Sequence, residues 1–434
     1  MENLDSFLQE HRAEGVPAEE GSFTINAARA MELVGEQSQP FAEAWVLKLV
    51  QAACVENCLS LLVTQDSTST TFTFQGATWT WAEVSEEIGR GAQGGRSSLD
   101  HLARALLWLA KGTAHTFSLR LAEGHCALWD GAEFHVQQAE STEVALCVQH
   151  SSGPLLWGLL ARRGLDLSVA IATILHQRAH TSSVPLYLDT WHLAGLHHNR
   201  RLSGNPNIRP LAVLTSPPSQ TLPGFAMSLT HDWEKVESGP EIHLRGHEPE
   251  EESCNGIVTL LAAFTKERKV SRGIGKTQLR SVADSGGSYL VWVLDGVVIA
   301  EEALKVEAPI GFVTAVSAAG LRTDLSGFGL VQSEELMARR RAALRALREQ
   351  IAEICLDTEM QIDVATQGGT FLKVQVASAA IGLLIFFPVG VLFAVNAYQV
   401  SKEETEHEKD MEKTYRLGLV KLRDGVAALL TDRA

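Results

Sequence analysis

The sequence predicts a mixed α+β protein with two α/β domains, an amphipathic helix and one transmembrane helix near the C-terminus. Helix and strand signals alternate through residue 148 and resume from residue 256. No residue between 374 and 401 is charged. With 434 residues, 45% of them hydrophobic and 21% charged, the chain is typical of a folded protein that is too long for one ordinary core.

The domain boundaries follow from changes in this pattern. The alternation of short elements ends near Ser152, and the acidic stretch from Glu248 to Glu252 is typical of a loop. We therefore predict an N-terminal tail at 1–20, a first domain at 21–152, a second α/β domain at 153–330, an amphipathic helix at 331–360, a transmembrane helix at 374–400 and a C-terminal tail at 401–434.

The first domain begins with a helix. Phe41 to Cys54 has apolar residues at the spacing of one helical face. Cys58–Val63 and Thr70–Phe74 are rich in apolar, β-branched and aromatic residues, which predicts a strand hairpin. Ser98 is a candidate N-cap for a helix from Leu99 to Lys111. Further strands are predicted at 116–121, 125–129 and 143–148.

The second domain combines one long helix with several strands. Leu155 to Leu175 has mainly helical spacing, and strands are predicted at 185–189, 211–215 and 288–294. The last of these ends at Asp295-Gly296, a dipeptide that favours a hairpin turn. The amphipathic helix at 334–356 has one apolar face opposite many arginines. Such a helix lies along a bilayer or, more commonly, packs on the protein body.

The stretch at 374–400 has the length and composition of a membrane span. A helix needs about 20 apolar residues to cross a bilayer. Lys373 and Lys402 bracket the stretch, and Tyr398 lies where an interfacial aromatic residue is common. Because residues 1–20 contain no apolar segment typical of a signal peptide, we expect a single-pass protein of the cytoplasmic membrane with its N-terminal body in the cytoplasm.

A glycine-rich segment precedes the second predicted helix of the first domain. Residues 89–98 read GRGAQGGRSS. Glycines at the start of a helix let backbone N–H groups approach a phosphate closely, so this segment is a candidate anion site. The alternative is a flexible surface loop, because an isolated glycine-rich motif without a preceding strand is a weak signal.

Two segments carry a resemblance to a known family. Residues 47–53 read LKLVQAA and residues 91–97 read GAQGGRS. With the order helix, hairpin, glycine-rich loop, helix and strands, they resemble the nucleotide-binding domain of the GHKL ATPases, which include gyrase, heat-shock chaperones and sensor histidine kinases. The resemblance implies an α/β sandwich followed by a second α/β domain. It also implies ATP as the cofactor, bound by Gln51, Gly91, Gly94, Gly95 and Ser97.

Three features depart from that family, one of which is the adenine-binding aspartate of its DxGxG box, absent from residues 74–79 (FQGATW). Lys48 stands where the family has its activating glutamate, and Ala52 stands where it has its magnesium-binding asparagine. The resemblance therefore implies a domain without acid–base or magnesium chemistry, so we predict no catalytic residue and no metal ligand.

Other sequence features exclude several classes of function. A formal net charge of -15 disfavours nucleic-acid binding. The six cysteines include no CxxC pair of the kind found in zinc or redox sites. Residues 272–277 read RGIGKT, like the end of a P-loop, but Val270 stands where that motif begins with glycine.

These observations lead to one predicted function and two alternatives. We predict a non-catalytic, GHKL-like scaffold or effector that couples recognition of a ligand or protein partner in the cytoplasm to the membrane. The first alternative is a membrane-tethered ATPase with a divergent nucleotide site. The second is an effector that inserts into the membrane when triggered. The expected partners are the lipid bilayer and an unidentified protein, and a homo-oligomer is an open alternative.

Overall fold

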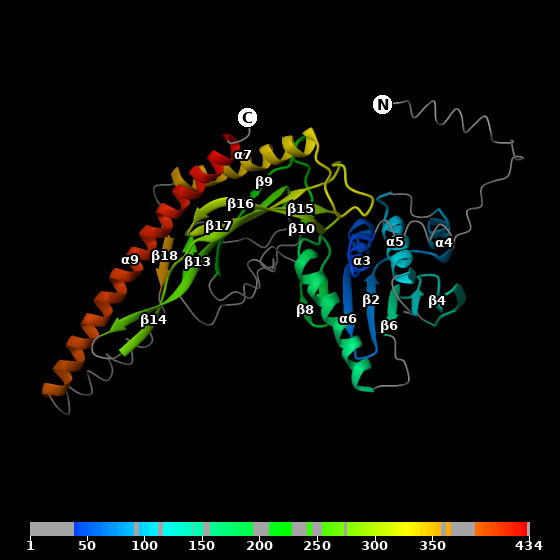
Figure 1. Cartoon of the computed structure of the whole chain (residues 1–434), viewed down its shortest axis with the longest axis horizontal. Coiled ribbons are helices and arrows are strands. Elements are labelled where there is room, and N and C mark those ends of the chain that lie inside the picture. Colours follow the sequence, from blue (N-terminus) through cyan, green and yellow to red (C-terminus); the bar gives the residue numbers. More distant parts are fainter. Residues whose placement is uncertain are drawn as a thin grey trace, which may run out of the picture.

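The computed structural model describes residues 39–90, 95–111, 116–140, 142–150, 157–193, 208–227, 241–244, 254–272, 276–356, 362–365 and 387–431. It has two large β-sheets with helices packed on them, which confirms the predicted mixed α+β class. Figure 1 shows the two sheets side by side, with the long helix α9 (Phe387–Thr431) at the end of the molecule away from the first sheet.

The first sheet has eight strands in the order β5-β4-β3-β6-β2-β1-β7-β8. Neighbouring strands are antiparallel except β1 and β7, which are parallel. The strands are β1 (Ser60–Gln65), β2 (Ser69–Gln75), β3 (Phe117–Arg120), β4 (His125–Trp129), β5 (Phe134–Gln138), β6 (Ala145–Gln149), β7 (Leu186–Leu188) and β8 (Trp191–His192). The predicted hairpin at 58–74 is confirmed as β1 and β2.

One face of this sheet is apolar and covered by helices. Phe72 pairs across β1 and β6 with Val63 and Leu146, and all three side chains are buried. Trp45 packs edge-on against Phe72, with ring centroids 5.5 Å apart, so its helix covers this face. The helices of the first domain are α3 (Ala44–Glu56), α4 (Trp81–Gly89), α5 (Ser98–Lys111) and α6 (Trp157–Arg178).

The first sheet extends beyond the predicted domain boundary at 152. The chain crosses over through α6 and returns as β7, which pairs in parallel with β1. Parallel neighbours need such a crossover, and a helix usually supplies it. Residues 157–192 therefore belong to the first sheet and not to the second domain as predicted.

The second sheet has six strands, β14-β13-β17-β15-β16 in order, with β9 paired to the first half of β13. Its apolar faces differ: Trp292 and Phe312 join the core that includes α7 and α9, whereas Val291 and Val313 join a smaller cluster on the other face. The strands are β9 (Ile208–Ser216), β13 (Ile257–Arg272), β14 (Lys276–Ala283), β15 (Gly286–Leu294), β16 (Val297–Ala308) and β17 (Ile310–Ser317).

Two small strand pairs and the predicted amphipathic helix complete this domain. The pairs are β10 (Ala226–Met227) with β12 (Cys254–Asn255), and β11 (Glu241–Leu244) with β18 (Ile362–Ala365). Helix α7 (Glu334–Leu356) confirms the predicted amphipathic helix. Its residues Leu344, Leu347 and Ile351 are fully buried, so this helix packs on the protein body.

The segment predicted to span a membrane falls only partly on the described residues. Positions 374–386 lie outside them, and positions 387–400 form the first third of α9. No described helix is both long enough and apolar enough to cross a bilayer. The transmembrane span therefore stays a prediction.

The residues predicted as a C-terminal tail continue α9 and pack on the body. Tyr415, Leu419, Leu422 and Val426 are fully buried. The Tyr415 hydroxyl donates to the backbone carbonyl of Phe264 at the middle of β13, at 3.0 Å. Up to Thr431 the predicted tail is thus a packed helix, and it lies on the same body as the residues that precede the apolar segment.

Candidate functional site

The turn between β15 and β16 meets α3 and α6 of the first domain. Asp295 (φ 51°) and Gly296 (φ 79°) both have positive φ, the signature of a type I′ hairpin turn, so the predicted turn is confirmed. A Cβ atom at position 296 would lie 2.4 Å from Cys54 Sγ on α3. The turn therefore approaches α3 so closely that only glycine fits.

Gln51, a predicted cofactor-binding residue, joins the two domains at this turn. Its Nε2 donates to the backbone carbonyl of Leu294 at 3.0 Å, and its Oε1 accepts from Lys48 Nζ at 2.8 Å. The residue is fully buried. Just beyond α6, the Thr181 hydroxyl donates to the carbonyl of Gly296 at 3.0 Å. The carboxamide of Gln51 is thus occupied by groups of the protein itself.

Lys48 is the most unusual residue of the site, because its amine is buried between the domains. The side chain is 1% exposed, and Nζ lies 4.5 Å from the ring centroid of Phe328 and 5.9 Å from that of Trp108. Burial lowers the pKa of this amine from 10.5 to about 7, with repulsion from Arg104 adding to the effect and attraction to Asp295 and Asp324 opposing it. Lys48 therefore titrates near neutral pH.

A second polar contact across the interface involves His101 on α5. Its Nε2 lies 3.2 Å from Oδ2 of Asp295, and its side chain is 4% exposed. Burial lowers the pKa of His101, although the hydrogen bond to Asp295 acts in the opposite direction. The turn is consequently held by a neutral amide contact on α3 and a histidine–carboxylate contact on α5.

The predicted phosphate loop lies only partly within the described residues. Gly91 and Gly94 are outside them, whereas Gly95 and Ser97 are described. Ser97 N donates to Asp100 Oδ2 at 3.1 Å, and Asp100 N donates to Ser97 Oγ at 3.1 Å. This reciprocal pair is a capping box, so the N-cap of α5 is Ser97 and not the predicted Ser98. A Cβ atom at Gly95 would lie 1.9 Å from Oδ2 of the same aspartate.

The start of α5 is thus occupied by the chain's own carboxylate. Asp100 takes the Ser97 N–H that a bound phosphate would otherwise use. Next to it, Arg96 donates to the backbone carbonyl of Leu321 in the second domain at 3.2 Å. The segment that follows the glycine-rich loop therefore contacts the second domain directly.

Two features of this region were missed at the sequence level. Helix α4 begins with a capping box in which Thr80 N donates to Glu83 Oε2 at 3.0 Å and Glu83 N donates to Thr80 Oγ1 at 3.4 Å. The Thr-x-x-Glu spacing was the available signal for this helix. The second feature is Glu56 at the end of α3, which accepts hydrogen bonds from Trp79 Nε1 and Ser98 Oγ. No local pattern marks that contact.

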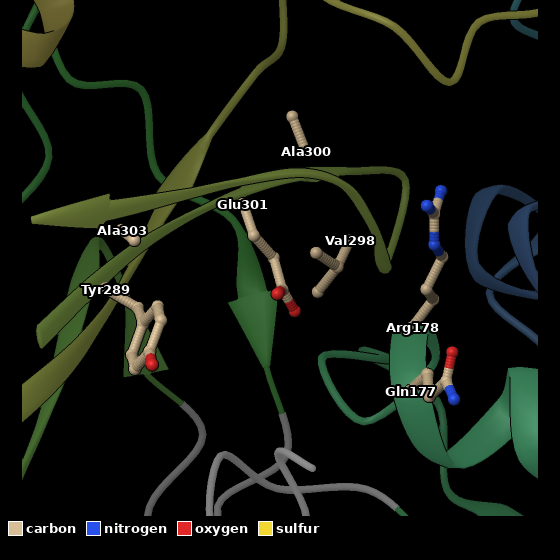
Figure 2. Close-up of a pocket in the computed structure, with 7 residues that line it drawn as sticks. All are labelled: Gln177, Arg178, Tyr289, Val298, Ala300, Glu301 and Ala303. Carbon is tan, nitrogen blue, oxygen red and sulfur yellow. The ribbon is translucent and has the colours of Figure 1, made fainter. Parts of the chain in front are cut away.

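A cavity of about 320 Å³ lies between the end of α6 and the strands β15 and β16. Figure 2 shows Arg178 on α6 and Glu301 on β16 on opposite sides of it. The Arg178 guanidinium also lies over the Phe41 ring, 5.0 Å from its centroid. The volume is at the lower end of the range for small-molecule sites. The lining residues are Gln177, Arg178, Tyr289, Val298, Ala300, Glu301 and Ala303.

Comparison with known proteins assigns this chain to no family. The chain matches no family model and no curated protein. Within the described ranges, no group of three or more His, Cys, Asp and Glu side chains is arranged to hold a metal ion. We call the hydrogen bonds from Gln51, His101 and Thr181 to the β15–β16 turn the polar interlock. It joins the two domains beside Lys48, whose pKa is near neutral.

Proposed function

We propose that this protein is a non-catalytic, GHKL-like scaffold or effector that couples recognition of a ligand or partner by its two domains to a membrane. The observation that carries this proposal is that both flanks of the apolar segment 374–400 pack on the second domain. Before the segment, β18 pairs with β11. After it, α9 packs against α7 and β16. Movement of the second domain would therefore act on both ends of the segment.

Support for the coupling comes from the β15–β16 hairpin. Its turn is hydrogen bonded to Gln51 and His101 of the first domain. Farther along β16, Val306 lies under α9, where a Cβ atom at Gly425 would be 2.8 Å from Val306 Cγ1. One continuous strand thus links the first domain to the helix that leads to the apolar segment. The cavity beside Arg178 and Glu301 lies on this strand and is our candidate ligand site.

Support for a non-catalytic role comes from the residues that replace the family's catalytic ones. Lys48 and Ala52 are buried, so neither presents a group to solvent. The Lys48 amine is committed to the Gln51 side chain within the protein, and alanine has no ligand atom for magnesium. At the start of α5, the Asp100 carboxylate accepts the hydrogen bond from Ser97 N, so this N–H is not available to a phosphate.

A second candidate, triggered insertion, is favoured by the position of the C-terminal half of α9. If 374–400 crossed a bilayer once, the residues after it would lie on the far side from the body. Tyr415 and Leu419 are instead buried on the body. Either the segment enters the membrane as a loop with both flanks held, or the tail leaves the body when the segment inserts.

Flotation of the full chain with phospholipid vesicles tests the membrane step. Leu384→Lys with Phe386→Lys places two charges in the apolar segment. We expect this variant to stop floating, because each charge costs roughly 3 kcal/mol at the centre of a bilayer. The matched control is Leu417→Lys with Val420→Lys, at positions of α9 that are 55% and 38% exposed. Equal flotation of all three proteins, or of none, contradicts a membrane role for this segment.

ATP hydrolysis tests the non-catalytic assignment. We expect the full chain to release no phosphate above the buffer rate in the presence of magnesium and ATP. The contradicting result is magnesium-dependent hydrolysis that Gly94→Asp abolishes, since that change would block a glycine-rich phosphate loop.

A further inference from the structure

A basic two-stranded ribbon extends from the second sheet. The first half of β13 lies between β9 and β17, but its second half, from Thr265 to Arg272, pairs with β14. Residues 266–280 contain six Lys or Arg residues and one Glu, a net charge of +5 in a chain whose formal net charge is -15. This concentration of positive charge runs against the character of the whole protein. We call the paired strands 265–272 and 276–283 the basic ribbon.

Internal ion pairs account for two of these charges. Lys266 pairs with Asp284 at 2.6 Å, and Arg280 pairs with Glu403 of α9 at 3.7 Å. Arg268 and Lys269 are exposed, and within the described part of the chain no acidic side chain forms an ion pair with either of them. The register places position 268 opposite 280 and position 272 opposite 276, so these four basic positions fall on one face of the ribbon.

Helix α9 runs beside this ribbon in a known direction. Tyr415 contacts Phe264 at the base of the ribbon, His407 Nε2 lies 2.9 Å from the carbonyl oxygen of Ser281, and Glu403 reaches Arg280. Following α9 toward its N-terminus therefore leads toward the tip of the ribbon. Figure 1 shows β14 beside the lower part of α9, at the end of the molecule farthest from the first sheet.

The tip of the ribbon is level with the uncharged part of α9. From Arg280 to Lys276 a strand advances about 13 Å, which corresponds to about nine residues of helix. Counting back from Glu403, the tip is level with about residue 394, within the last two turns of the stretch that ends at Ser401 without a charge. Positive charge and apolar helix thus lie together at one end of the protein.

We propose that the basic ribbon binds the anionic headgroups of a phospholipid membrane and aligns the apolar segment with the bilayer. This inference rests on the proposed membrane function and names the kind of surface that the basic ribbon would recognise. Lys and Arg residues next to a membrane segment are attracted to acidic lipids, and each contributes roughly fivefold to partitioning near such a surface. Nucleic acid also presents phosphate groups to a basic surface. Binding of nucleic acid, however, would not explain why an apolar helix lies beside the ribbon.

Vesicle flotation of the full chain tests the ribbon, with vesicles of phosphatidylcholine alone and of phosphatidylcholine mixed with phosphatidylserine. We expect stronger partitioning to the mixed vesicles. Arg268→Gln with Lys269→Gln should weaken that partitioning by roughly tenfold to thirtyfold and leave partitioning to neutral vesicles unchanged. Arg345→Gln with Arg348→Gln is the matched control, because it removes the same charge from exposed positions on α7, and it should bind as the unmodified chain does.

The outcomes separate the two proposals. Flotation that is independent of lipid charge, or an equal loss in the α7 control, overturns the role of the ribbon and leaves the membrane function standing. Failure to float on either composition overturns both. Binding of an oligoribonucleotide at physiological salt, lost in the ribbon variant without any dependence on lipid charge, reassigns the ribbon to nucleic acid and also overturns the proposal.

Discussion

Lys48 is buried by the second domain although its position on α3 predicts exposure to solvent. On α3 it lies outside the apolar face formed by Trp45, Leu49 and Ala53, which predicts exposure to solvent. In the fold its amine is covered by Phe328 and Trp108 and is satisfied by the Gln51 side chain. A buried ammonium is tolerated only with such partners. The burial of Lys48 thus depends on side chains from both domains.

The stability of the protein should therefore depend on pH through Lys48. The folded-state pKa of Lys48 is about 7 and the ordinary pKa of lysine is 10.5, so between these values the unfolded chain holds a proton that the folded chain lacks. Linkage then makes this group's contribution to the free energy of unfolding rise as pH rises through that window. Lys48→Met removes the titration. Between pH 6 and pH 9 we expect the unmodified protein to gain roughly 2 kcal/mol relative to this variant.

Urea unfolding of both proteins at the two pH values measures that difference. Because Lys48→Met is compared with the unmodified chain at each pH, the titration of all other groups cancels to first order. A difference in unfolding free energy that does not change with pH would show that Lys48 has an ordinary pKa.

Gly296 provides a second prediction about single residues. Gly296→Ala adds a Cβ atom where Cys54 Sγ is 2.4 Å away and φ is +79°, so the turn must withdraw from α3. Gly131→Ala is the matched control, since it has φ +108° but no atom within 4 Å of the new Cβ. Backbone strain is common to both, at about 1 kcal/mol. We expect the Gly296 variant to lose roughly 1–3 kcal/mol more in urea unfolding, and equal losses would contradict close contact at this turn.

Among the elements, α9 has two different environments along one continuous helix. Its first residues belong to the uncharged stretch, whereas from Met411 onward it presents a buried apolar face to the second domain. Gly418 and Gly425 allow this close packing, because Cβ atoms there would meet Pro309 at 2.6 Å and Val306 at 2.8 Å. One continuous helix therefore runs from its packed part on the second domain into residues 387–400 of the apolar segment.

A designed disulfide tests the position of α9. The Cβ position of residue 425 lies 3.6 Å from the Cβ of Val306, within the range for a disulfide. We expect Val306→Cys with Gly425→Cys to cross-link on mild oxidation, as judged by mass spectrometry of proteolytic fragments. Gly425→Cys alone is the control for cross-linking to the native Cys355, whose thiol pKa is raised mainly by burial and is also influenced by the nearby Arg423 and Asp424. Absence of the designed bond would contradict the packing of α9 on β16.

The same cross-link distinguishes two ways of reaching a membrane. If the segment enters as a loop with both flanks held, the oxidised variant should float with vesicles as the reduced one does. If α9 must leave the body, oxidation should abolish flotation and a reductant should restore it.

At the scale of the whole molecule, the two domains share one hydrophobic core. A single cluster of buried residues includes Trp45 of α3, Trp292 of β15 and Leu422 of α9. Residues that share one core usually unfold as one cooperative unit. We therefore expect these two domains to unfold together, whereas domains with separate cores often unfold independently. The polar interlock at Gln51 lies within this shared core.

We therefore expect one transition when the full chain is unfolded in urea. Far-UV circular dichroism and tryptophan fluorescence should give the same midpoint, because Trp45, Trp108 and Trp292 report on both domains. Gly296→Ala, which weakens the contact at the turn, should lower this common midpoint. Two resolved transitions in the unmodified chain would show that the domains are energetically independent.

Residues close in the sequence were sufficient to predict much of the fold. The helix at α3, the β1–β2 hairpin, the Asp295-Gly296 turn and the amphipathic α7 all depend on spacing or turn chemistry within a few residues. Helix α4 was missed although its Thr80–Glu83 capping box is equally local. The candidate site was predicted only as far as Gln51 and the start of α5, and the partners of these residues were not.

Those partners depend on contacts that no local pattern contains. Gln51 reaches Leu294 across 243 positions of sequence, and α6 returns the chain to place β7 beside β1. Charge and hydropathy mark an apolar stretch at 374–400 and basic residues at 266–280, but they do not show that α9 runs beside the ribbon. Packing decided that arrangement, because burial of Tyr415 and Leu419 on the second domain holds the two segments together.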